Sequence, residues 1–264
     1  MKSVLEFAAA KAAGRKISMT TCYDASFARV LEASAVDCLL VGDSAAMVMH
    51  GFPDTLAATV EMMAWHTAAV RRGAPTRFLI GDMPFLSFRK GVPAALDAAA
   101  ALMRAGAQAV KLEGVTGHED VITALTGSGV PVMGHLGLTP QSVHALAGFR
   151  VQGRTDDSAA RILADAKRCE ELGCFALVLE AVPAALAGQI TASLRIPTIG
   201  VGAGLHCDGQ VLVLQDLLGL NSGFRPKFLR TYLDGAALVR DAMDRFDRDI
   251  KQGGFPGPAE SYDS

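Results

Sequence analysis

The sequence predicts a single (β/α)8 barrel preceded by a short N-terminal helix. Short runs rich in Val, Ile and Leu alternate with helix-like stretches about eight times along the chain. These runs are apolar at nearly every position, which is typical of parallel strands that are buried on both faces. Because the chain has 264 residues, half of them hydrophobic, it fits one closed barrel better than an open sheet.

The eight apolar runs have the length and composition of buried strands. Most of them end in a glycine or a polar residue, as strands of this class do where they reach the mouth of a barrel. The predicted strands are Ile17–Thr21, Cys38–Gly42, Phe78–Asp82, Ala109–Glu113, Pro131–His135, Ala176–Glu180, Thr198–Val201 and Val211–Leu214.

Helix patterns fill the intervals between the strands, and several of them end at a glycine. Pro93, Pro183 and Pro226 stand where a first helical turn tolerates a missing N–H, so they predict helix starts. The stretch 7–13 predicts a short amphipathic helix. The predicted connecting helices include Ala25–Ser34, Val60–Arg72, Ala94–Arg104, Asp157–Leu172 and Ala184–Leu194.

Composition excludes several classes of partner. A net charge of -2 provides no basic field for nucleic acid, so we expect a small-molecule ligand. No apolar stretch approaches the ~20 residues of a membrane span. Five cysteines without a CxxC pair argue against a disulfide framework and favour the cytoplasm. No linker divides the chain, so we expect one domain over residues 1–264, with a tail over 253–264.

In a barrel of this kind the active site lies at the C-terminal ends of the strands, so ionisable residues at those ends are the first candidates. Any one of them could be structural, but their appearance at six successive strands favours a site. The candidates are Tyr23, Asp24, Asp43, Ser44, Asp82, Lys111, Glu113, His135 and Glu180.

Three acids among these candidates predict a metal site. Asp43, Asp82 and Glu113 end three successive strands, and neighbouring strands lie about 4.8 Å apart. Two like charges 4 Å apart repel by about 4 kcal/mol at an effective dielectric of 20, so a cation would stabilise the group. Oxygen ligands favour Mg²⁺, while His135 keeps Mn²⁺, Co²⁺ or Zn²⁺ open. The alternative is an ion pair of Lys111 and Glu113 without a metal.

Glu180 is the candidate for a general base. It ends an apolar strand that could partly desolvate its carboxylate, and desolvation raises a carboxylate pKa toward that of a useful base. The alternative is that Glu180 caps the helix that follows near Pro183.

Several segments at the strand ends carry a family resemblance across nearly the whole chain. They resemble the ketopantoate (3-methyl-2-oxobutanoate) hydroxymethyltransferase family, a TIM barrel of the phosphoenolpyruvate/pyruvate-binding type. The segments are Thr20–Asp24, Leu40–Ser44, His66–Val70, Val110–Gly114, Gly134–Ser142, Val151–Arg154, Ile199–Gly204, Cys207–Val211 and Pro226–Phe228.

The resemblance implies transfer of a hydroxymethyl group from 5,10-methylenetetrahydrofolate to 3-methyl-2-oxobutanoate, a step of pantothenate and coenzyme A synthesis. It implies that Asp43 and Asp82 bind one Mg²⁺ per subunit, with Glu113 joining directly or through water. By the same resemblance, Ser44 and Lys111 hold the oxo acid together with these two aspartates, and Glu180 is the proton acceptor. We expect His135 to line the site, and the family pattern implies a homodecamer of stacked pentamers.

The chain departs from the family pattern beside the predicted site. Ala46 replaces a glycine, and the loop 50–59 differs from the sequence that is usual in the family. Both changes affect the shape of the substrate or folate pocket. One alternative function is another Mg²⁺-dependent 2-oxo-acid lyase or mutase, of the phosphonopyruvate and isocitrate lyase kind. The chain lacks the Lys-Lys-Cys-Gly-His loop of those lyases. A non-catalytic binding barrel is the remaining alternative, and the retention of all the acids argues against it.

Overall fold

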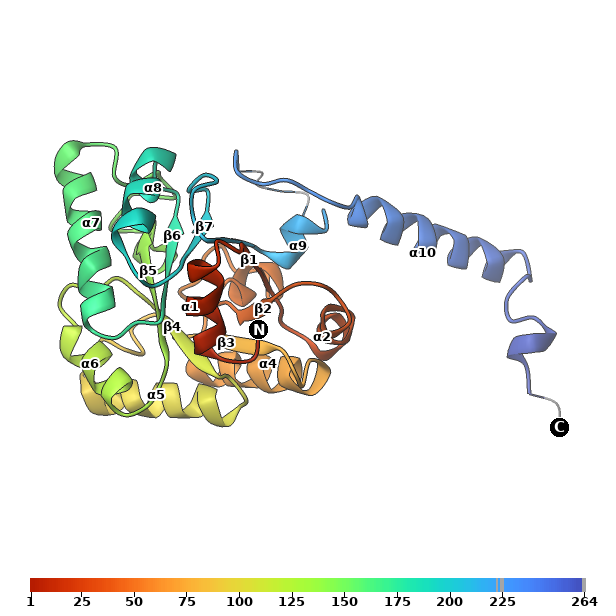
Figure 1. The fold of residues 1–264 in the computed structure, drawn as a ribbon. Coiled ribbons are helices and arrows are strands. Elements are labelled where there is room, and N and C mark those ends of the chain that lie inside the picture. Colours follow the sequence, from red (N-terminus) through yellow and green to blue (C-terminus); the bar gives the residue numbers. More distant parts are fainter. Residues whose placement is uncertain (222, 224–225, 263–264) are drawn as a thin grey trace. The chain divides into compact units, whose positions relative to one another are not determined.

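A closed barrel of eight parallel strands lies within residues 1–213 of the computed structural model, which describes residues 1–221, 223 and 226–262 (Figure 1). Each strand pairs with the next one along the chain, and β8 pairs with β1 to close the barrel. The predicted fold is therefore confirmed. The strands are β1 Ile17–Thr21, β2 Cys38–Val41, β3 Phe78–Asp82, β4 Ala109–Glu113, β5 Val132–Gly137, β6 Ala176–Glu180, β7 Thr198–Val201 and β8 Gly209–Leu212.

Helices connect the strands and lie outside the barrel (Figure 1). The five predicted connecting helices all occur within two residues of their expected bounds, and the N-terminal helix begins three residues earlier than expected. The helices of this part are α1 Val4–Ala12, α2 Ala25–Glu32, α3 Ala45–Val48, α4 Val60–Gly73, α5 Val92–Arg104, α6 Glu119–Gly127, the 3-10 turn η1 Pro140–Ser142, α7 Asp156–Glu171 and α8 Ala184–Ser193.

Helix α4 illustrates how the sequence sets these connections. The Thr59 side chain accepts a hydrogen bond from the Met62 N–H and so satisfies one free donor of the first turn. Met63, Thr67 and Val70 are buried at a spacing of four and three residues, which places them on one helix face. Helix α4 contacts both β2 and β3, so this buried face packs on that part of the barrel.

An aromatic cluster closes the N-terminal end of the barrel. Phe7 of α1 is fully buried, and its ring lies 5.2 Å from the rings of both Phe78 and Phe175. Buried aromatic pairs at this separation stabilise beyond the area that they remove from water. Because the aromatic cluster closes the N-terminal end of the barrel, the C-terminal end is the one left for ligands.

Residues 214–264 form a second compact unit, with α9 Leu214–Leu217, α10 Gly235–Lys251 and the 3-10 turn η2 Pro258–Glu260. The prediction that Pro226 opens the last helix is wrong. Helix α10 begins at Gly235, because the Asp234 side chain accepts a hydrogen bond from the Ala237 N–H. Within the described ranges, no helix combines the length and the apolar character needed to cross a membrane.

Candidate active site

The ends of strands β2 to β6 bring the predicted residues together at one mouth of the barrel. Strand register places Asp82 opposite Lys111 and Glu113 opposite His135. Because side chains alternate along a strand, Lys111 and Glu113 share one face of β4. Asp43, Asp82, Lys111, Glu113 and His135 are all buried.

Lys111 and Asp82 form a buried ion pair. The Lys111 Nζ lies 2.6 Å from the Asp82 Oδ1, and the two side chains are only 5% and 2% exposed. Burial alone would lower the pKa of Lys111, but Asp82, Glu113 and Asp43 outweigh it and raise that pKa. Lys111 therefore carries its charge and offsets one of the acids.

The remaining carboxylates are short of positive charge. Burial, together with repulsion from Asp82 and Glu113, raises the pKa of Asp43 well above its usual value of 3.8. The pKa of Asp82 is also raised, because burial outweighs the attraction of Lys111. The Asp43 main-chain N–H donates to the Asp82 Oδ2 at 3.2 Å, which holds the two strand ends together. The acids are thus held close at an electrostatic cost.

Gln141 of η1 contacts two of these carboxylates, and the strand-end pattern did not predict it as a site residue. Its side-chain Nε2 donates to the Asp43 Oδ2 at 2.8 Å and to the Met83 carbonyl at 2.9 Å. Its main-chain N–H donates to the Glu113 Oε2 at 3.0 Å. Gln141 is a neutral amide in a loop, so it is not among the ionisable residues at strand ends. The sequence singles it out only as part of the segment Gly134–Ser142, which carries the family resemblance.

His135 lies between the acid cluster and Glu180. Its Nδ1 is 3.4 Å from the Glu113 Oε1, and its Nε2 is 3.3 Å from the Glu180 Oε2. Burial and Lys111 lower the pKa of His135, but its interactions with Glu113 and Glu180 prevail and raise it to about 9. The raised pKa favours the protonated imidazole, whose Nδ1 also lies 3.4 Å from the Lys111 Nζ.

The backbone around Glu180 is unusual and fixes its direction. Ala181, the next residue, has a φ of 46°, a region that non-glycine residues seldom adopt and that is common at functional sites. Gly137 has a φ of 94°, and a Cβ at that position would clash with the Glu180 carbonyl oxygen. No side chain caps α8, so Glu180 does not serve as the helix cap that was its alternative role.

Ser44 lies at the rim of the site and is held by an aromatic residue. Its Oγ is 2.8 Å from the hydroxyl of Tyr23, a fully buried side chain whose pKa is raised by burial. Asp24, which the strand-end pattern also selected, caps α2 by accepting from the N–H groups of Ser26 and Phe27. Tyr23 therefore belongs to the site, and Asp24 has a structural role.

The donor set offers the carboxylate oxygens that a hard divalent cation prefers. Asp43, Asp82 and Glu113 are buried carboxylates on adjacent strands, and Lys111 offsets only one of them directly. Among the residues that the structure describes, no group of three or more His, Cys, Asp or Glu side chains is arranged so that it could hold a metal ion. A site of three carboxylates suits an ion that keeps water or substrate in several positions, as Mg²⁺ does.

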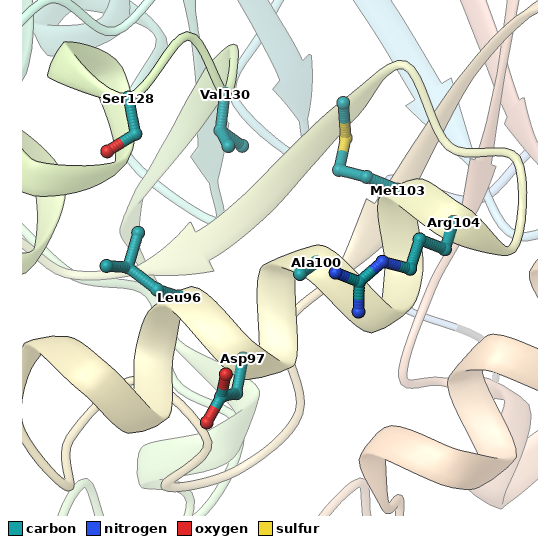
Figure 2. A pocket seen from close by; sticks show the side chains of 7 residues that line it. All are labelled: Leu96, Asp97, Ala100, Met103, Arg104, Ser128 and Val130. Atoms are coloured by element: carbon teal, nitrogen blue, oxygen red, sulfur yellow. The ribbon is translucent and has the colours of Figure 1, made fainter.

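A surface pocket of about 410 Å³ lies elsewhere, between α5 and the segment after α6 (Figure 2). None of the predicted site residues lines it. Its lining residues are Leu96, Asp97, Ala100, Met103, Arg104, Ser128 and Val130. This pocket is therefore separate from the reactive side chains.

Comparison with known proteins relates the whole chain to one family. The family model of ketopantoate hydroxymethyltransferase matches residues 2–258. A 3-methyl-2-oxobutanoate hydroxymethyltransferase of Bdellovibrio bacteriovorus is 54% identical over 262 residues and aligns over 99% of this chain and 100% of its own length. The enzyme of that name from Francisella tularensis subsp. tularensis is 47% identical, with 100% and 99% covered.

Solved structures show the same fold at low identity. A phosphonopyruvate hydrolase in complex with oxalate and Mg²⁺ aligns with a TM-score of 0.65 at 14% identity, over 98% of this chain and 93% of its own. A 2,3-dimethylmalate lyase of the phosphoenolpyruvate mutase/isocitrate lyase superfamily aligns with a TM-score of 0.61 at 16% identity, over 100% and 92%.

Proposed function

The chain belongs to the ketopantoate hydroxymethyltransferase family, and from that premise we propose how its strand-end residues carry out the reaction. The protein is a hydroxymethyltransferase of pantothenate synthesis that converts 3-methyl-2-oxobutanoate into ketopantoate. The one-carbon donor is 5,10-methylenetetrahydrofolate. In the overall reaction the C3–H bond of the oxo acid and the two bonds from the donor's methylene carbon to nitrogen break, and C3 bonds to that methylene carbon. Water supplies the hydroxyl group, and tetrahydrofolate leaves with the C3 proton and the second water proton on its two nitrogens.

One observation supports this proposal above the others: the partly exposed Glu180 faces the buried acid cluster across His135. The side chain of Glu180 is 19% exposed, whereas that of His135 is 3% exposed. A substrate that enters the mouth therefore meets Glu180 first and the acids behind it. This arrangement suits removal of a proton beside a carbonyl that is held at the cluster.

Each residue has a role in that step. Lys111 and Ser44 bind the carboxylate and 2-oxo group of the substrate, and Glu180 removes the proton from C3. His135, which donates toward Glu180, holds that carboxylate in line with C3. The Tyr23 hydroxyl fixes the Ser44 side chain at the rim. The carbanionic C3 of the resulting enolate then forms the new carbon–carbon bond.

Asp43 and Asp82 would hold Mg²⁺, and Glu113 would join directly or through a water molecule. When bound, the ion supplies Lewis-acid polarisation of the 2-oxo group. Its charge would also relieve the repulsion that raises the pKa of Asp43.

Proton exchange without folate tests the base. In D₂O with Mg²⁺, NMR should show exchange of the C3 proton of 3-methyl-2-oxobutanoate, and Glu180→Gln should slow it by about 10²–10⁴, the usual worth of a positioned base. Glu171→Gln makes the same change at an exposed position and should exchange like the wild type. If Glu180→Gln exchanges as fast as the wild type, Glu180 is not the base. Exchange without ketopantoate formation after the donor is added would indicate a different acceptor or donor.

We also propose that the enzyme works in the cytoplasm as a homodecamer of stacked pentamers. All five cysteines are free, which suits a reducing compartment. The decamer follows from the family pattern, and native mass spectrometry tests it: a mass other than ten chains would contradict this assembly.

A further inference from the structure

Gln141 links three strand ends of the acid cluster through one residue. It reaches Asp43 after β2 and Met83 after β3 with its side chain, and Glu113 at the end of β4 with its main chain. We propose that Gln141 is a positioning residue that holds two metal-binding carboxylates in the orientation that the cation requires. The inference rests on the proposed function, because it takes the cluster to be a metal site.

The chemistry of its contacts determines which side chain can occupy this position. The Asp43 carboxylate and the Met83 carbonyl can only accept hydrogen bonds, so the group between them must donate two hydrogens. The Gln141 amide nitrogen does so at 2.8 Å and 2.9 Å. A lysine would also donate, but its positive charge would repel a divalent cation. A neutral amide satisfies both acceptors and leaves the charge of Asp43 available.

The contacts of Gln141 do not use the Oδ1 of Asp43, whereas the Oε1 of Glu113 lies 3.4 Å from the His135 Nδ1. Gln141 engages the Oδ2 of Asp43 and the Oε2 of Glu113, so the Oδ1 of Asp43 can face a cation. Gln141 itself is buried, only 6% exposed, so water does not readily replace its hydrogen bonds. Partners that orient metal ligands in this way typically change metal affinity by about 10–100-fold when they are removed.

Two substitutions at this position distinguish the effect of losing the hydrogen-bond donor from the effect of losing side-chain volume. Gln141→Met keeps a side chain of similar length without the donor, and Gln141→Glu places an acceptor against two acceptors. The main-chain bond to Glu113 survives both. The matched control is Gln108→Met. Gln108 also makes side-chain hydrogen bonds, to Lys2 and Arg71, but it precedes β4 at the opposite end of the barrel.

The experiment measures the dissociation constant of Mn²⁺ by electron paramagnetic resonance, with thermal midpoints of the metal-free proteins alongside. We expect both Gln141 variants to bind Mn²⁺ about 10–100-fold more weakly. Gln108→Met should lower the thermal midpoint and leave the dissociation constant within twofold. Saturating Mn²⁺ should restore most of the turnover of Gln141→Met, because the defect lies in metal binding.

The outcomes distinguish this proposal from the proposed function. If wild-type protein binds no Mn²⁺, the metal site itself is wrong. If the wild type binds Mn²⁺ and a folded Gln141 variant binds it equally well, the positioning role is overturned. Either variant alone is sufficient for that comparison, so one that does not fold can be replaced by the other. An equal loss of affinity in Gln108→Met would also overturn the role, because it would show a general effect of destabilisation.

Discussion

Replacing Lys111 by methionine removes the ammonium group that pairs with Asp82 in the acid cluster. In the metal-free protein the Asp82 carboxylate would then be buried without its partner at 2.6 Å. At an effective dielectric of 20, two unit charges at that distance attract by about 6 kcal/mol. Part of this attraction is offset by the desolvation that the pair already bears, and loss of one partner of a buried pair costs about 3–5 kcal/mol.

Protonation of Asp82 limits that cost, and the limit depends on pH. Its carboxyl has a usual pKa of 3.8, so taking up a proton at pH 7 costs about 4.4 kcal/mol, at about 1.36 kcal/mol per pH unit. At pH 5 the same limit is about 1.6 kcal/mol. A raised carboxylate pKa means that the folded state holds the proton more tightly, so stability is lost as the pH rises above 3.8.

We therefore expect Lys111→Met to lose about 3–4 kcal/mol at pH 7, or about 6–16 °C in thermal midpoint at 2–4 °C per kcal/mol. The deficit should shrink to less than half at pH 5. Differential scanning calorimetry of chelator-treated protein measures both values. The control is Lys251→Met, which breaks an exposed ion pair of similar length and should cost no more than about 0.5 kcal/mol. A deficit below 2 °C at pH 7, or one equally large at pH 5, would refute the reasoning.

Two further predictions concern Asp43 and Gly137. Asp43→Asn removes a carboxylate whose pKa is raised by burial and by neighbouring acids. The thermal midpoint of the metal-free protein should therefore rise at pH 7 by about 2–4 °C per kcal/mol of repulsion relieved, and Mg²⁺ should no longer stabilise the protein. A lower midpoint in calorimetry would contradict this. Gly137→Ala should cost at least about 1–3 kcal/mol in denaturant unfolding and also slow C3 exchange, because its Cβ would displace the Glu180 carbonyl. The control is Gly129→Ala: Gly129 has a φ of 83° and no atoms near its Cβ position, so this change introduces the backbone strain without a clash. If both variants slow C3 exchange equally, displacement of the Glu180 carbonyl is not the cause.

The local sequence pattern predicts most strands, but it fails where the limits of a strand are set by its pairing with a neighbouring strand. Strand β4 runs from Ala109 to Glu113 as predicted, because its apolar run has clear polar limits. Strand β8 begins at Gly209, two residues before the prediction. Gly209 and the next residue have no apolar side chain, and they belong to the strand because they pair with β1. That pairing joins residues almost 200 positions apart, so no local pattern reports it.

The same distinction separates the site residues that could be predicted from those that could not. A carboxylate at a strand end is fixed in space by the fold class, so Asp82 and Glu113 follow from the sequence once the barrel is recognised. Gln141 lies beyond the end of β5 on a 3-10 turn, and its contact with Asp43 joins residues 98 positions apart. A loop of this kind has no regular period, so only the structure reveals where its amide points.

The balance of charge identifies Asp43 as the residue on which a metal would act most strongly. Asp82 has Lys111 at 2.6 Å, and Glu113 has the protonated His135 at 3.4 Å. The Asp43 carboxylate accepts a hydrogen bond from the neutral amide of Gln141, and burial together with Asp82 and Glu113 raises its pKa well above the usual value despite the attraction of Lys111. The charged form of the Asp43 carboxyl is thus disfavoured in the metal-free fold. A bound cation would remove that repulsion, so the strain in the folded protein becomes part of the affinity for the ion.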